Sequence, residues 1–181
     1  MQSRFSIRGH PLHPLLVAIP IGLFIWTFIA DLVYLGSDKD GTWYDISLWT
    51  GVAAIFAALV AAVPGFGDYL TVALHSDSRI MATLHMVLNL AVVALFAIAA
   101  ALAIDDGATS GGALAAMVLL HAVGVGLLSI SGALGGEMVY RHHLAMIPDD
   151  IEQDTAERRR HLAEAQPHVA REPGSPGSVE R

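Results

Sequence analysis

Three histidines stand in or beside the long apolar stretches of this chain. They are His13, His85 and His121, and His10 precedes the first of them. An ionisable side chain at membrane depth is costly, so such residues mark ligand sites, proton relays or polar contacts between helices. Burial keeps an imidazole neutral, and neutral imidazole is the form that binds a metal ion or a haem iron. All four histidines are therefore candidate axial ligands of a haem, or ligands of another metal.

The depths of these histidines limit how they can pair. His85 stands early in the apolar stretch 81–104, whereas His121 stands near the middle of the stretch 112–134. At 1.5 Å per residue the two depths differ by about 10 Å, so a haem bound by both would be strongly tilted. His13 matches His85 better in depth. Two other interpretations stay open: His13 as a helix cap, and the inner histidines as interhelical hydrogen bonds worth about 0.6 kcal/mol each.

Further polar and small residues accompany the histidines. Asn89 follows His85 by one helical turn and shares its face. Asp68 ends the segment Pro64-Gly65-Phe66-Gly67-Asp68, and it is a candidate to orient one imidazole by hydrogen bonding. Gly124 and Gly132 share a face with His121, where small residues allow either close helix packing or a flat surface for a macrocycle.

The elements that must position these residues are four apolar segments. They cover residues 15–35, 46–63, 81–104 and 112–134. A helix needs about 20 apolar residues to cross the hydrocarbon core of a bilayer. Since the segments lack the alternation of barrel strands, we expect four transmembrane helices. The first is longer than the apolar part of a signal peptide, so it should remain in the mature protein.

The ends of the helices are predicted from local signals. Pro14 suits the first helical position, which leaves His13 at the N-cap. Pro64 and the glycines after it are predicted to end the second helix. Asp31, the one charge in the first segment, stands near its outer end and is expected to be hydrated.

Short connections predict an all-α bundle in which the helices run up, down, up and down. Cytoplasmic loops carry an excess of Lys and Arg. Four basic residues adjoin one side of the predicted bundle, against Lys39 alone on the other: Arg4, Arg8, Arg79 and Arg141. The sequence thus predicts a multi-pass membrane protein with both termini in the cytoplasm. Trp43, Tyr44 and Trp49 would form an aromatic anchor at the outer interface.

The composition changes at the end of the bundle. Residues 1–147 form the predicted transmembrane domain, and residues 148–181 are polar and rich in charge, Pro and Gly. Such a segment buries too little apolar surface to offset its chain entropy. We expect a short surface helix from Asp149 to Ala165 and disorder from Glu164 to Arg181.

Composition also excludes several kinds of site and partner. The chain has 181 residues, of which 54% are hydrophobic and 15% charged, where a soluble domain has about 25% charged residues. No cysteine is present, which excludes disulfides, thiolate metal sites and covalent haem attachment. The net charge of -7 argues against nucleic acid as a partner. The sequence has no motif for nucleotide, phosphate or acyl chemistry, so no such motif indicates an enzyme.

Several motifs together resemble a known family. They are Gly-His-Pro-Leu-His-Pro at residues 9–14, Pro20-Ile21-Gly22, the Pro64–Asp68 segment, His85, His121 and Gly135-Gly136-x-x-Val139-Tyr140. This pattern, over residues 7–144, is similar to the bacterial family of small predicted four-helix membrane proteins of unknown function. The resemblance implies the fold, a membrane location and an unassigned role. Some relatives are joined to a Rieske-type iron–sulfur domain, which implies electron transfer, but this chain has no cysteine for such a cluster.

Two functions follow as hypotheses. The first is a small electron-transfer subunit that binds haem b non-covalently and works with redox partner proteins or a second copy of itself. Its candidate axial ligands are His85 and His121, with His13 or His10. The alternative is a non-redox membrane module, either a proton or metal-ion conduit or an accessory subunit, whose histidines brace the helices.

Overall fold

The computed structural model describes residues 6–7, 10–71, 77–105, 111–140 and 157–162 of the chain. It divides the chain into two units, Met1–Met146 and Ile147–Arg181. In the second unit residues 157–162 are helical, inside the range predicted for a surface helix. The segment predicted to be disordered, Glu164 to Arg181, lies outside the described residues.

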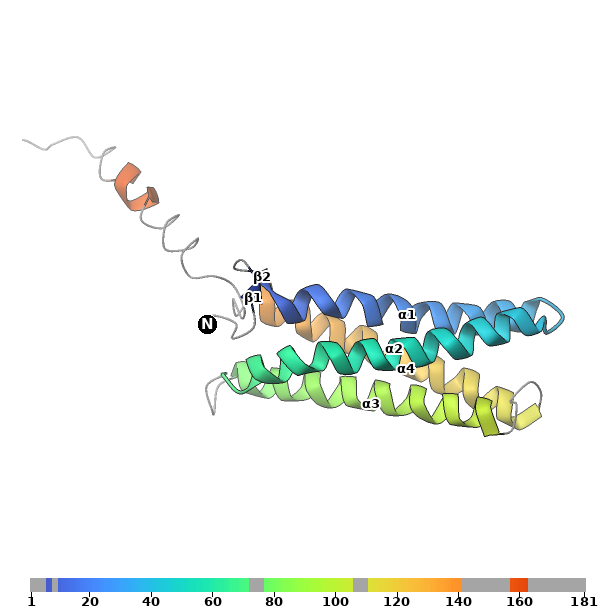
Figure 1. Ribbon diagram of the computed structural model, residues 1–181. Helices are drawn as coiled ribbons and strands as arrows, with labels where there is room; N and C mark the ends of the chain where they lie inside the picture. The colour runs from blue at the N-terminus through green and yellow to red at the C-terminus, as the bar shows by residue number, and fades with distance from the viewer. Residues whose placement is uncertain (1–5, 8–9, 72–76, 106–110, 141–156, 163–181) are drawn as a thin grey trace, which may run out of the picture. The chain divides into compact units, whose positions relative to one another are not determined.

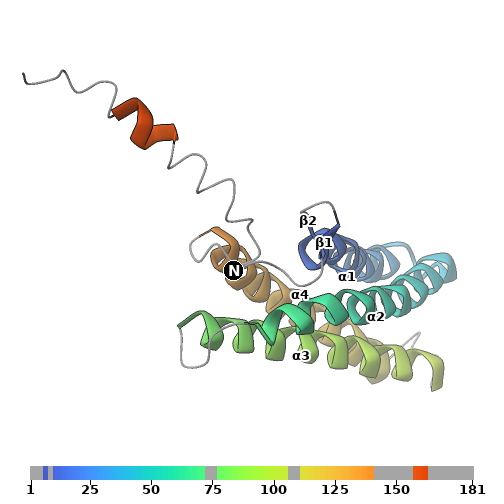
Figure 2. The same ribbon diagram turned by 60° about the vertical axis from the view of Figure 1, so that its left-hand side comes forward.

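Four long antiparallel helices make up the first unit (Figures 1 and 2). They are α1 (Leu12–Gly36), α2 (Gly41–Tyr69), α3 (Asp77–Asp105) and α4 (Gly111–Tyr140). Two short strands, β1 (Ser6–Ile7) and β2 (His10–Pro11), pair in antiparallel fashion before α1. The predicted all-α bundle is confirmed. We call the end where α1 and α3 begin the N-terminal end, and the other the opposite end.

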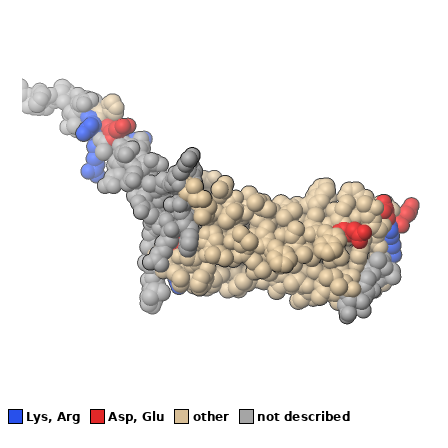
Figure 3. Space-filling view, in the orientation of Figure 1, with Lys and Arg blue, Asp and Glu red and all other residues tan. Residues whose placement is uncertain are grey.

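The surface of the bundle is suited to lipid. Each helix contains a span long enough to cross a membrane, with a mean hydropathy of 2.2 to 2.7. Large apolar side chains point outward, among them Ile19, Phe56 and Leu119. In Figure 3 the charged side chains visible on the bundle lie toward one end, and a broad uncharged band covers the rest. A helix that is apolar on all sides belongs in a bilayer, so the protein is a multi-pass membrane protein.

The helices extend beyond the predicted segments. The prediction that Pro64 ends the second helix was wrong, because α2 continues through it to Tyr69. Proline removes the hydrogen bond to the carbonyl four residues earlier, but neighbouring helices in a membrane can satisfy freed backbone groups. A contact from a neighbouring helix lies in the same turn, where Nδ1 of His13 in α1 is 2.9 Å from the carbonyl oxygen of Ala61. In the same way α4 passes through Gly135 and Gly136 to Tyr140.

The start of α1 also differs from the prediction. The helix begins at Leu12, and its N-cap is Pro11, which makes no side-chain cap. His13 is therefore inside the helix and is not the predicted N-cap. Pro14 still lies in the first turn, where backbone N–H groups have no partner inside the helix and none is lost.

The four helices pack as two hairpins. The contacts of α1 are mainly with α2, and those of α3 mainly with α4, so α1 and α3 lie diagonally across the bundle. A buried apolar layer joins the hairpins near their middle; its residues are Phe24, Ala54, Val92, Phe96 and Leu128. The rings of Phe24 and Phe96 lie 4.4 Å apart between centroids. This apolar layer separates two polar clusters described below.

The α1–α2 connection shows why α2 begins where it does. Asp38 and Lys39 have positive φ angles, and Asp40 caps α2 by accepting the backbone N–H of Thr42 at 2.9 Å. This backbone hydrogen bond stabilises the carboxylate and lowers the pKa of Asp40. Of the predicted aromatic anchor, Trp49 is exposed, whereas Trp43 and Tyr44 are half-buried against the core. The Tyr44 hydroxyl donates to the carbonyl of Ala103 in α3.

Candidate functional site

Two histidines meet inside the N-terminal end of the bundle. His13 is the second residue of α1, and His85 lies two turns into α3. Their ring centroids are 6.4 Å apart, and the ring planes are perpendicular. Because α1 and α3 are diagonal, both side chains reach toward the bundle axis. The structure thus brings together the two histidines whose depths match; we call them the His13–His85 pair.

Each ring of this pair is fixed by a backbone carbonyl. Nδ1 of His13 lies 2.9 Å from the oxygen of Ala61, and Nδ1 of His85 lies 2.9 Å from the oxygen of Ser131. A carbonyl oxygen only accepts hydrogen bonds, so each Nδ1 carries the hydrogen and donates it. In a neutral imidazole this leaves the lone pair on Nε2 of both rings.

Asn89 lies beside His85, as its spacing of one helical turn predicts. Its amide nitrogen Nδ2 is 2.7 Å from Oγ of Ser131, 2.8 Å from the carbonyl of His85 and 3.1 Å from Nε2 of His85. An amide group has two hydrogens, and the two shorter contacts use both. The contact with Nε2 of His85 is the longest of the three, and a ligand bound to that nitrogen would displace the Asn89 amide from it.

Two glycines leave room for these rings. A Cβ atom at Gly65 of α2 would lie 2.6 Å from Nδ1 of His13, and a Cβ at Gly135 of α4 would lie 3.1 Å from Cε1 of His85. Gly132, one turn before Gly136 on α4, has nothing within 4 Å of such a Cβ and is exposed. The rings are thus held between helices that need glycine at the contact points.

We expect Gly65→Ala to destabilise the bundle by about 1–3 kcal/mol, the usual effect of overpacking. The His13 ring cannot yield freely because its Nδ1 is bonded to Ala61. Gly132→Ala is the matched control, and it should be neutral or slightly stabilising since alanine is the better helix former. Thermal unfolding of the detergent-solubilised variants measures both effects. Equal midpoints for the two variants would contradict this packing.

A second polar cluster lies on the other side of the apolar layer. Nδ1 of His121 in α4 is 2.6 Å from Oδ2 of Asp31 in α1, and Ser47 of α2 donates its hydroxyl to Oδ1 of the same carboxylate. Asp31 is 0% exposed and His121 4% exposed. The His121 ring stacks on Phe96 at 4.4 Å between centroids. We call His121 and Asp31 the His121–Asp31 pair.

The burial of Asp31 corrects the sequence prediction that this residue is hydrated. Its position near the end of α1 indicates depth but not the direction in which the side chain points. Thr27, Asp31 and Tyr34 are all buried and follow at spacings of four and three residues, which places them on one face of the helix. That spacing of polar side chains was the signal that could have identified Asp31 as inward-facing.

His121 and His85 are not brought together. Ser131, which contacts His85, lies ten residues after His121 on α4, and ten residues correspond to about 15 Å. The apolar layer around Phe24 and Phe96 fills the interval. Within the described residues no group of three His, Asp or Glu side chains is arranged to hold a metal ion.

The remaining predicted site residues have other surroundings. A Cβ at Gly124 would lie 2.6 Å from Cε2 of Phe96, so an aromatic ring already fills the space beside this glycine. Gly132 faces open space. Asp68 is half-buried near the end of α2, and its carbonyl accepts the hydroxyl of Thr71; its role in orienting an imidazole stays a prediction. His10 belongs to β2, and its side chain lies outside the described part of the chain.

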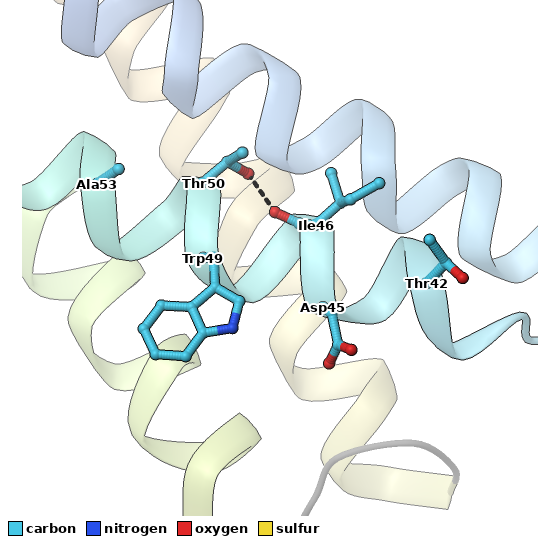
Figure 4. A pocket seen from close by; sticks show the side chains of 6 residues that line it. All are labelled: Thr42, Asp45, Ile46, Trp49, Thr50 and Ala53. Carbon is cyan, nitrogen blue, oxygen red and sulfur yellow. Dashed lines mark hydrogen bonds between the residues drawn. The ribbon is translucent and has the colours of Figure 1, made fainter.

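A shallow hollow of about 480 Å³ lies on α2 near the opposite end (Figure 4). Its lining residues are Thr42, Asp45, Ile46, Trp49, Thr50 and Ala53. All six come from one helix, and the Thr50 hydroxyl is already bonded to the carbonyl of Ile46. The hollow is therefore a feature of the surface of α2 and is separate from the histidine clusters.

The family of the chain is decided by a match over most of the bundle. A family model described as "Predicted membrane protein (DUF2231)" matches residues 9–148. The chain belongs to this family. The DUF2231 region contains all four long helices and both histidine clusters. Comparisons with curated proteins and with solved structures found no match for the chain.

Proposed function

We propose that this DUF2231 protein binds one haem b between His13 and His85 and serves in electron transfer within the membrane. The observation that carries the proposal is the pairing of two imidazoles from diagonal helices, each with its Nδ1 bonded to a carbonyl. Cofactor sites in helix bundles are commonly built in this way, from side chains on facing helices that project into the core.

The separation of the two rings suits two ligands on opposite sides of one metal. A nitrogen ligand lies about 2 Å from the metal, and the ring centroid about 1 Å farther, so two opposed imidazoles have centroids roughly 6 Å apart. The centroids of His13 and His85 are 6.4 Å apart. Two imidazoles at tetrahedral angles would lie closer together. The distance is compatible with a single haem that His13 and His85 would hold together.

The hydrogen bonds of Nδ1 have a direct role in this proposal. Histidines that bind metals usually donate their other N–H to a carbonyl or carboxylate, which fixes the ring and makes the ligating nitrogen more basic. Ala61 and Ser131 supply those carbonyls here. When bound, the haem would supply the one-electron chemistry, while the bundle holds the two rings and provides an apolar surrounding.

Absorption spectra of the purified full-length protein, produced with added haem, test the proposal. We expect about one haem per chain and the reduced bands of a bis-histidine b-type haem after dithionite treatment. His13→Ala and His85→Ala should each lose these bands while keeping helical circular dichroism. His85→Met guards against misfolding as the cause, because methionine can still bind iron and should raise the reduction potential.

The double variant Asp31→Leu/His121→Leu is the control, since it replaces the other cluster by apolar residues. Its spectrum should match that of the wild type. A colourless wild-type protein, or bands that persist in both His13→Ala and His85→Ala, would contradict the haem proposal. In that event the alternative from the sequence, a non-redox module with histidines that brace the helices, is favoured by the same carbonyl contacts.

The orientation in the membrane is a further part of the proposal. We infer a bacterial cytoplasmic membrane with both termini inside, because basic residues adjoin the N-terminal end of the bundle. The absence of cysteine makes single-cysteine labelling clean. Asp38→Cys, in the α1–α2 connection, should react with an impermeant maleimide in intact cells, and Leu70→Cys, at the end of α2, only after permeabilisation. The reverse pattern would invert the orientation. An electron-transfer role also requires a redox partner protein or a second copy of the chain at one of these ends.

A further inference from the structure

The His121–Asp31 pair has no part in the proposed haem site, yet it is among the most deeply buried polar groups of the protein. Its two members come from different hairpins, α4 and α1. A carboxyl group that is 0% exposed in a membrane-spanning bundle is retained only where a partner compensates it. We propose that the His121–Asp31 pair is a proton-binding site, which takes up and releases a proton within the membrane-spanning bundle.

The charge balance of the pair explains this assignment. A neutral imidazole beside a carboxylate carries a net charge of -1. Adding one proton gives an imidazolium beside a carboxylate, or an imidazole beside a carboxylic acid, and both forms are neutral overall. A net charge in an apolar interior is strongly unfavourable, whereas the neutral form is compatible with it. Each exchange of a proton thus changes the buried charge by one unit.

The described side chains that contact the pair from α2 and α3 are uncharged. From α2 the neighbour is Ser47, which donates to Oδ1 of Asp31, and from α3 it is the apolar ring of Phe96. Tyr34 and Tyr44 lie one turn farther toward the opposite end, where the Tyr44 hydroxyl is bonded to Ala103. Among the described residues of the bundle, the contacts of the pair include no Lys or Arg. Protonation is therefore decided between His121 and Asp31.

The order of the three side chains excludes a nucleophilic serine. In a hydrolytic triad the imidazole lies between the serine and the carboxylate, so that it can take the hydroxyl proton. Here Asp31 lies in the middle, and both Ser47 and His121 contact its oxygens. The arrangement stabilises a carboxylate and its proton and does not activate the hydroxyl of Ser47.

The pair is also isolated from the His13–His85 pair. Toward the N-terminal end of the bundle, the hydroxyl oxygens of Thr27 and Thr50 lie 3.0 Å apart. Each hydroxyl also donates to a carbonyl of its own helix, that of Leu23 for Thr27 and that of Ile46 for Thr50. The apolar layer follows. A proton on the His121–Asp31 pair therefore has no hydrogen-bonded route among these side chains to the other histidines, and its binding does not depend on haem.

Nuclear magnetic resonance of the full chain, labelled with ¹⁵N-histidine and held in lipid nanodiscs, tests the proposal. The ring-nitrogen signals of His121, assigned by their loss in His121→Gln, report its protonation between about pH 5 and about pH 9. We expect these signals to change with pH in the wild type. In Asp31→Asn, which keeps a hydrogen-bond acceptor but not the charge, the ring should stay neutral over the whole range because nothing compensates an imidazolium.

His13→Ala is the control, and it should leave the titration of His121 unchanged. Signals of His121 that do not move in the wild type would overturn the proposal, and so would an Asp31→Asn variant that titrates like the wild type. The wild-type titration alone decides the question if Asp31→Asn fails to fold. Since no step of this test involves haem, its failure is distinguishable from failure of the proposed haem site.

Discussion

Replacing His121 by leucine is expected to destabilise the bundle by about 3–5 kcal/mol, because it leaves a buried carboxylate without its partner. Asp31 is 0% exposed, and Ser47 would be its one remaining contact among those described above. Asp31→Leu should cost less, about 1–3 kcal/mol, since it leaves a neutral imidazole and a hydroxyl unsatisfied but no buried charge. The double variant should be more stable than His121→Leu alone, because two apolar residues can pack without desolvated charge.

Reversible unfolding of the four proteins in mixed detergent micelles measures this cycle. The matched control is Leu119→Ala on the same helix, where the side chain is 63% exposed and its loss should change the unfolding free energy little. If the effects of Asp31→Leu and His121→Leu were simply additive, the two side chains would not act as a pair. A strong coupling between them is the result that the 2.6 Å contact requires.

The fold was largely predictable because hydropathy responds to one constraint, the thickness of the bilayer. Four apolar segments therefore gave the four helices. Their ends were predicted less well, because the rule that a proline such as Pro64 ends a helix describes helices in water. In α2 the helix continues past this proline, and the carbonyl of Ala61 in the same turn accepts from His13, a residue almost fifty positions earlier in the chain. Such a tertiary contact is not encoded in the local sequence.

The depth of each site residue along the bundle was predictable, but the side of the helix on which its side chain lies was not. Counting residues from the helix ends placed His13 with His85 and separated both from His121, and the structure has this arrangement. Counting does not reveal which way a side chain points around the helix axis. Asp31 was assigned to water for this reason, and its partner on α4 could not be named, since the contact depends on how the two hairpins dock.

The apolar layer between the two clusters has its own expected signature. Phe96 contacts Phe24 and His121 at 4.4 Å between ring centroids and fills the space beside Gly124. Phe96→Ala should cost about 3–5 kcal/mol of stability, the usual penalty for a large cavity left in a core. Ile98→Ala is the control on the same helix, because that side chain is 51% exposed. Unfolding in mixed micelles again provides the measurement.

The fit between Phe96 and Gly124 can be separated from the general effect of the cavity. Gly124→Ala should cost about 1–3 kcal/mol in the wild type, because its Cβ would lie 2.6 Å from the ring. In a Phe96→Ala background the same change should be neutral or stabilising, since the ring is gone and the new methyl group fills part of the cavity. If Gly124→Ala were equally costly in both backgrounds, its effect would come from the helix itself, and Phe96 would not be the residue that requires glycine there.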